Sequence, residues 1–100
     1  MHTQQQFKAR VARVLALTAR TLDPQQSRHQ HSAQVVDKLV NISKRCSLIH
    51  NLLQMGMKRG EFEALVAREI DFLRCSELFL DQLGIRHLRD AEAKERGGLI

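Results

Sequence analysis

Residues 35–53 have the sequence VVDKLVNISKRCSLIHNLL, and the spacing of their apolar side chains decides the fold. Six of them recur at alternating steps of four and three positions: Val35, Leu39, Ile42, Cys46, Ile49 and Leu53. This spacing is typical of a helix that buries one seam against partner helices. Leu48, Leu52 and, just beyond the stretch, Met55 add apolar side chains outside that seam. A helix that is apolar on most faces at one end is usually central in a bundle.

A first helix is predicted over residues 4–22, where Thr3 and Gln6 fit a capping box that satisfies the first free backbone donors. At about 100° per residue, one face of this helix is apolar. That face consists of Phe7, Val11, Val14, Leu15 and Leu22, and the stripe beside it consists of Ala9, Ala12, Ala16 and Ala19. Because alanines allow a close approach of another helix, we expect this helix to be covered on two adjacent sides.

The Asp23-Pro24 step ends the first helix, since proline lacks a backbone donor and pushes the preceding residue out of the α region. The central helix is expected to begin between residues 24 and 32, capped by Asp23 or by Ser27. We expect it to end at Met55, before a glycine.

A third helix is predicted over residues 61–83, followed by Gly84 as a left-handed terminator. Its apolar face consists of Phe62, Leu65, Val66, Leu73, Leu80 and Leu83. A short fourth helix is predicted over residues 86–96. Chain length, a single proline and the lack of any alternating apolar pattern together predict one all-α domain over residues 1–100. The fold class is a small helical bundle with three main helices and a short C-terminal one.

The two cysteines, Cys46 and Cys75, lie on or beside apolar helix faces without metal-ligand spacing. We expect both to be buried free thiols in a reducing compartment, which favours a cytoplasmic protein. No segment is long and apolar enough to suggest a membrane span. Because the first and third helices each show more than one apolar face, self-association into a homo-oligomer is expected.

Charge is distributed unevenly along a chain whose formal net charge is +5. Ten basic and two acidic residues occupy positions 1–60, whereas residues 61–83 carry six acids and two arginines. The basic half supplies candidate partner-binding or phosphate-binding residues: Arg10, Arg13, Arg20, Arg28, Lys38, Lys44, Lys58 and Arg59. Alternatively, the acidic third helix neutralises part of this charge, within the chain or across a dimer.

Glu69 falls on the apolar face of the third helix, among Phe62, Val66 and Leu73. A buried carboxylate is costly unless it is paired. We therefore expect Glu69 to form a salt bridge at the edge of the bundle or across a dimer seam. A role in determining the specificity of an interface is the alternative.

Arg45 and His50 stand on the central helix with four residues between them. The pair resembles the R-x4-6-H motif of HEPN ribonucleases, all-α proteins that dimerise to cut RNA. That resemblance implies that the arginine and the histidine would bind the phosphate and carry the acid–base step, which makes them catalytic candidates. Otherwise, Arg45 faces solvent and His50 packs beside the seam.

His29 and His31 are the only pair of residues whose spacing suggests a metal site. Since no further ligands stand near them in the sequence, we expect them to lie in a solvated basic turn instead. The sequence shows no glycine-rich phosphate loop, no pair of catalytic carboxylates and no Ser/His/Asp arrangement. We therefore expect neither a metal nor another cofactor.

These observations favour a non-catalytic regulatory or adaptor protein that docks on a protein partner through helical surfaces. The alternative is a nucleic-acid-associated protein making sequence-tolerant phosphate contacts through its basic half. Against this alternative, all four phenylalanines look like core residues, which leaves no aromatic platform for unstacked bases. A ribonuclease using Arg45 and His50 is the third hypothesis.

Overall fold

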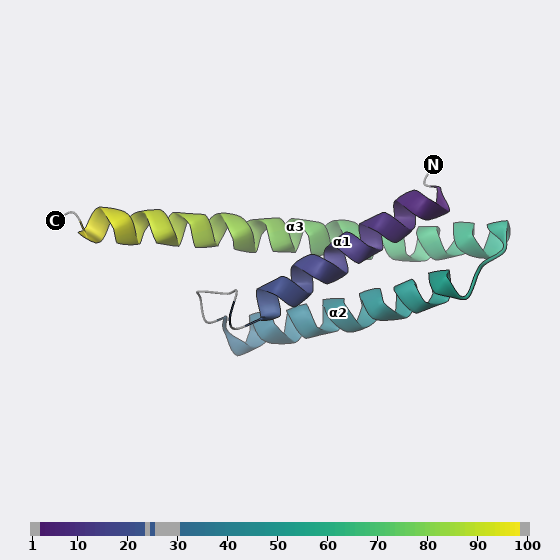
Figure 1. Ribbon diagram of the computed structural model, residues 1–100, viewed down its shortest axis with the longest axis horizontal. Coiled ribbons are helices and arrows are strands. Elements are labelled where there is room, and N and C mark those ends of the chain that lie inside the picture. Colours follow the sequence, from purple (N-terminus) through teal and green to yellow (C-terminus); the bar gives the residue numbers. More distant parts are fainter. Residues whose placement is uncertain (1–2, 24, 26–30, 99–100) are drawn as a thin grey trace.

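The computed structural model describes the backbone of residues 3–23, 25 and 31–98, and the side chains of these residues as far as Gly84. Within these ranges it contains three helices: α1 (Gln4–Leu22), α2 (Ala33–Gln54) and α3 (Arg59–Gly98). The all-α prediction is confirmed. Figure 1 shows α2 and α3 joined at one end and diverging from there, with α1 crossing in front of α3 and ending beside the start of α2. At about 1.5 Å per residue, the 40 residues of α3 account for the 61 Å long axis.

Local hydrogen bonds explain where α1 and α2 begin. The Gln6 amide donates to Thr3 Oγ1, and the Thr3 amide donates to Gln6 Oε1, each at 3.1 Å, which confirms the capping box. The cap of α2 is Ser32, whose Oγ accepts from the Val35 amide at 3.3 Å. The expectation that Asp23 caps α2 is wrong, since Asp23 forms the C-cap of α1. The other expected cap, Ser27, lies outside the described residues.

The turn between α2 and α3 depends on one left-handed glycine. Met55 caps the end of α2, and Gly56 follows with a φ of 83°, a conformation that costs a residue without Cβ little. Helix α3 begins at Arg59, two residues earlier than predicted, because the Phe62 amide already donates to the Lys58 carbonyl at 2.9 Å. Gly84 does not end α3, which continues to Gly98. The separate helix expected over residues 86–96 falls outside the described side chains.

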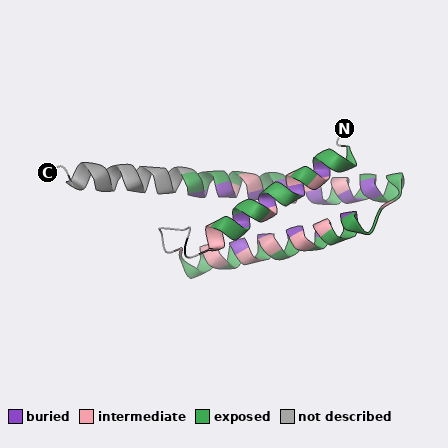
Figure 2. Cartoon of the chain, in the orientation of Figure 1, coloured by how far each residue is buried: buried purple, intermediate pink, exposed green. Residues whose placement is uncertain are grey.

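The core lies where the three helices face one another (Figure 2). The predicted seam of α2 is confirmed: Leu39, Ile42, Cys46, Ile49 and Leu53 are buried, and Val35 packs partly buried at its edge. Phe7, Val11 and Val14 of α1 and Phe62, Leu65, Leu73, Leu80 and Leu83 of α3 complete it. The rings of Phe7 and Phe62 pack at 5.7 Å between centroids and join the start of α1 to the start of α3.

Three groups of residues that were expected to be covered are exposed. Leu48, Leu52 and Met55 lie outside the seam of α2 and remain in contact with solvent, because neither α1 nor α3 packs over them. The alanine stripe of α1 is also exposed, so the chain itself does not cover a second face of this helix. Cys75 is exposed, whereas Cys46 is buried. Among the described residues, no helix has both the length and the apolar character that crossing a bilayer requires.

Candidate functional site

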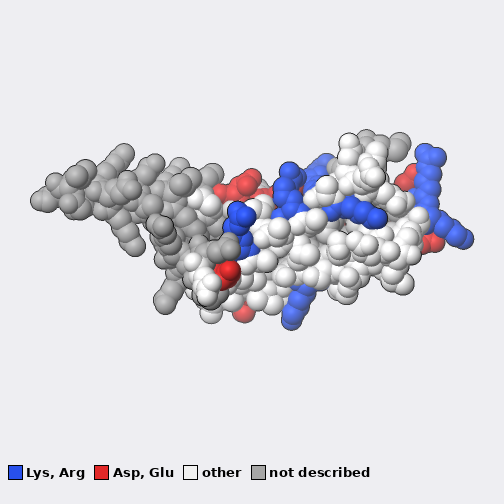
Figure 3. Space-filling model, viewed as in Figure 1, with Lys and Arg blue, Asp and Glu red and all other residues white. Residues whose placement is uncertain are grey.

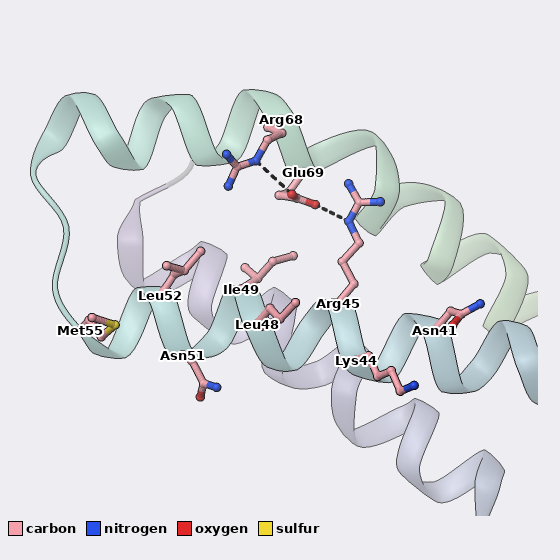
Figure 4. A pocket seen from close by; sticks show the side chains of 10 residues that line it. All are labelled: Asn41, Lys44, Arg45, Leu48, Ile49, Asn51, Leu52, Met55, Arg68 and Glu69. Atoms are coloured by element: carbon pink, nitrogen blue, oxygen red, sulfur yellow. Dashed lines mark hydrogen bonds and ion pairs between the residues drawn. The ribbon is translucent and has the colours of Figure 1, made fainter.

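A groove of about 610 Å³ runs between α2 and α3. Arg68 and Glu69 of α3 form one wall, and the rest of its lining comes from α2 and its C-cap (Figure 4). The α2 residues are Asn41, Lys44, Arg45, Leu48, Ile49, Asn51, Leu52 and Met55. Helix α1 contributes no lining residue, and its ribbon passes behind the pair in this view. The groove is thus the side of the α2–α3 pair that the chain leaves uncovered.

A three-residue cluster connects the two walls of the groove. Glu69 is only 7% exposed, and its two carboxylate oxygens accept from two different arginines. Arg45 Nε donates to Oε2 at 2.7 Å, and Arg68 Nε donates to Oε1 at 3.2 Å. The Arg45 guanidinium also lies over the Phe72 ring, 4.3 Å from its centroid. The expectation of a salt bridge for Glu69 at the edge of the bundle is therefore confirmed, within one chain.

Each guanidinium in this cluster bonds Glu69 through Nε, which leaves its terminal nitrogens available. The Arg45 and Arg68 side chains are 48% and 64% exposed, and no hydrogen bond to another described residue uses their terminal nitrogens. One carboxylate against two guanidinium groups leaves an excess of one positive charge. Lys44, on the same lining, has no ionic partner among the described residues and adds another. The groove therefore carries excess positive charge at the end where Arg45 lies.

Towards the other end, the α2 wall is apolar. Leu48, Leu52 and Met55 lie at steps of four and three, so they form one row along the helix. Leu48 is 65% exposed and Met55 is 81% exposed. Single exposed apolar side chains are normal on a protein surface, but a row of them in a hollow bordered by charges is typical of an interaction site.

Two of the predicted basic candidates, Arg10 and Arg13, form ion pairs with Glu77 of α3. Glu77 accepts from Arg10 through Nε, at 3.0 and 3.2 Å to its two oxygens, and through Nη2. Arg13 Nη2 reaches the same carboxylate at 3.3 Å. Glu69 and Glu77 stand eight residues apart, or about 80° around α3, so one carboxylate meets α2 and the other meets α1. The prediction that the acidic third helix neutralises part of the basic charge is confirmed within the chain.

The remaining basic candidates are dispersed. Lys38 Nζ lies 4.3 Å from the centroid of the Phe79 ring, and Arg59 pairs with Glu63 one turn further along α3. Arg20, Lys44 and Lys58 are exposed without a described partner, and Arg28 lies outside the described residues. On the face shown in Figure 3, basic side chains are separated by uncharged surface, and acidic groups lie beside several of them. On that face, the described basic candidates do not form one continuous basic surface.

The two catalytic candidates are not joined by a contact in the described part of the chain. Five positions on a helix place side chains about 140° apart, and Arg45 is engaged by Glu69 and Phe72 of α3. His50 Nε2 lies 3.3 Å from Gln54 Nε2, and its Nδ1 is buried without a hydrogen-bond partner. Arg45 is exposed, as the alternative expectation had it, and it also contacts Glu69 and Phe72 of α3.

The thiol and metal-ligand candidates can be compared with the structure. Burial raises the pKa of the Cys46 thiol to about 11, with Arg45 acting in the opposite direction, so this cysteine is protonated at neutral pH. Among the described residues, no group of three or more His, Cys, Asp or Glu side chains could hold a metal ion. His29, one of the two histidines considered as ligands, lies outside those residues.

Sequence reasoning missed Arg68 as a site residue, as well as the exposure of the row formed by Leu48, Leu52 and Met55. The signal for the row was its spacing, which follows one line along α2 beside the seam. That spacing alone does not distinguish a surface covered by the fold from one left open. Arg68 could have been noticed as the residue before an acid that stands on an apolar face.

No family model matches the chain, and comparisons with curated proteins and with solved structures found no significant match.

Proposed function

We propose that the protein is a non-catalytic adaptor that docks a partner protein in the groove between α2 and α3. The observation that carries this proposal is the row of Leu48, Leu52 and Met55, left exposed beside the Arg45–Glu69–Arg68 cluster. A helix from a partner would bury this row and meet the charged end of the groove. Helix-in-groove recognition uses this combination of apolar anchors at helical spacing and charged groups at the border.

The surface left on α1 supports self-association as part of the same proposal. The exposed alanine stripe and Leu17, 38% exposed, lie away from the groove, on a helix that contributes nothing to its lining. A second copy could cover α1 while the groove remains open to a partner. Homo-oligomerisation and partner docking would then use different surfaces.

Nucleic-acid binding, the alternative, draws less support from this arrangement. Arg10, Arg13, Arg45, Arg59 and Arg68 all lie in ion pairs with glutamates. Each paired arginine offers less net charge to a phosphate backbone, whose affinity for a protein rises with the number of phosphates neutralised. Among the exposed cations without an ion pair in the described part of the chain, Arg20, Lys44 and Lys58 come from α1, from α2 and from the turn before α3.

The test is capture from a lysate of the native host on immobilised protein, with and without nuclease. We expect a protein partner that is retained by the parent after nuclease treatment and lost with Leu48→Asp. Leu78→Asp is the matched control, because Leu78 is also an exposed leucine, at 59%, but lies on α3 outside the groove.

If the Leu48→Asp and Leu78→Asp proteins retained the partner equally well, docking in the groove would be contradicted. Retention that disappears on nuclease treatment would favour the nucleic-acid alternative instead.

A further inference from the structure

The groove also indicates what kind of partner it accepts, a step that depends on the proposed docking function. Its lining contains three cations, Lys44, Arg45 and Arg68, and one carboxylate, Glu69. The occupant should therefore carry negative charge, since a neutral or basic occupant would leave these cations unpaired or repelled.

The two arginines are held in place before any partner arrives. Glu69 is buried and bonds both Nε atoms, and the Arg45 guanidinium also lies over the Phe72 ring. Side chains that are already ordered lose little conformational entropy on binding. Their free terminal nitrogens are donors suited to a carboxylate, which pairs with guanidinium groups in well-defined geometries.

The apolar row sets the form of the occupant. From Asn41 to Met55 the α2 wall rises about 1.5 Å per residue, which gives a groove of roughly four helical turns. Leu48, Leu52 and Met55 would pack against aliphatic side chains that repeat at helical spacing on the partner. Arg45 precedes Leu48 by about one turn, so the acidic residue should lie one turn beyond the aliphatic row.

A second copy of the chain is a poor occupant for the groove. In a two-fold dimer the same surface meets itself, because such an interface is isologous. Such a dimer would bring six cations into one interface with only two glutamates, because each groove contributes Lys44, Arg45, Arg68 and Glu69. We infer that the groove binds an acidic amphipathic helix of a partner protein, with aliphatic residues on the row and a carboxylate on Arg45 and Arg68.

The inference can be tested with the full chain and defined peptides. The probe is a fluorescently labelled synthetic amphipathic helix with leucines at steps of four and three and glutamates one turn beyond them. Two matched peptides carry glutamine or lysine in place of glutamate. We expect the glutamate peptide to bind roughly tenfold or more tightly than the glutamine peptide, as charged hydrogen bonds of about 1.5–3 kcal/mol imply. The lysine peptide should not bind.

Variants locate the binding. Arg68→Met should remove the preference for the glutamate peptide over the glutamine peptide. Leu48→Asp should weaken the affinity for the glutamate peptide at least tenfold. Arg74→Met and Leu78→Asp are the controls, because both alter exposed α3 residues outside the groove and should leave the affinity unchanged. Circular dichroism of each variant checks that the helices are retained.

Several results would overturn the inference: no preference for glutamate, a preference unaffected by Arg68→Met, or no binding of any peptide. Displacement of the glutamate peptide by single-stranded RNA at equal concentration would identify a phosphate site instead. A doubled mass that Leu48→Asp abolishes would show that a second copy fills the groove. If the peptides failed but a protein partner were still captured and lost with Leu48→Asp, only the inference of an acidic helix would fail. Loss of that capture as well would contradict the proposed docking function.

Discussion

Arg45 on α2 and Glu69 on α3 form an ion pair that joins these two helices, with 2.7 Å between Nε and Oε2. The Glu69 side chain is 9% exposed and the Arg45 side chain is 48% exposed. The acid is thus desolvated by the fold, while much of the base stays open to water. This asymmetry makes Glu69 a structural residue and leaves Arg45 available to a ligand.

Glu69→Gln should destabilise the protein. The amide group of glutamine would turn an N–H towards one of the two arginines, so one charged hydrogen bond is lost and a donor faces a donor. We expect the free energy of unfolding to fall by about 1–3 kcal/mol in urea titrations. Glu63→Gln, in the exposed pair with Arg59, is the control and should cost about 0.5 kcal/mol or less. If both substitutions lowered the free energy of unfolding equally, the burial of Glu69 would not strengthen its ion pairs.

Ile42→Asp and Leu73→Asp should each abolish cooperative unfolding. Both side chains are buried in the seam, and an aspartate there would be left unpaired in apolar surroundings. Thermal melts followed by circular dichroism test this, with Leu78→Asp as an exposed control. A parent-like melt of either core variant would contradict the observed packing.

The two cysteines should react at very different rates with a thiol reagent in the native state. Cys75 is exposed and should react quickly, whereas Cys46 is buried and protonated and should react only on unfolding. The count of thiols labelled before and after denaturation measures this. Fast labelling of both thiols in the native protein would refute the burial of Cys46.

The raised pKa of the Cys46 thiol predicts that the protein loses stability at alkaline pH. Its pKa rises from 9.0 to about 11 in the folded chain, so the native state keeps a proton that the unfolded state releases between these values. The unfolded state is therefore favoured progressively as pH rises through this window, and stability declines. Urea titrations at several pH values should show a smaller decline for Cys46→Ala than for the parent. The same decline in both proteins would assign it to other groups.

Arg10 and Arg20 should respond differently to charge reversal, although both are basic residues of α1. Arg10 is paired with Glu77 on α3, so Arg10→Glu sets two carboxylates together and should cost roughly 1–3 kcal/mol. Arg20 is exposed, and Arg20→Glu should change stability by about 0.5 kcal/mol or less. Urea titrations measure both, and a stable Arg10→Glu protein would contradict the α1–α3 ion pair.

The native mass should exceed the 11.5 kDa of one chain in light scattering at micromolar concentration. Ala16→Glu places a charge within the exposed alanine stripe of α1 and should lower that mass. Ala64→Glu, at an exposed alanine of α3, is the control. Leu48→Asp should leave the mass unchanged if association and docking use different surfaces. A monomeric parent would refute self-association.

Much of the helical architecture could be predicted from residue spacing. The seam from Leu39 to Leu53, the capping box at Thr3 and the turn at Gly56 are local features, since periodicity and capping act over a few residues. The error at Gly84 has the same origin. A glycine often ends a helix but does not oblige it to end, and α3 continues through it.

The sequence by itself determined that the chain forms helices, where α1 begins, and which side chains of each helix are apolar. Tertiary structure decided which of those apolar side chains are covered. Helix α1 packs on one side of α2 and α3, so Ile49 becomes core while Leu48, one position away, stays exposed in the groove. It also decided that Glu69 meets Arg45 and that Glu77 meets Arg10. Such pairings depend on how the helices cross, because they join residues that are distant in sequence.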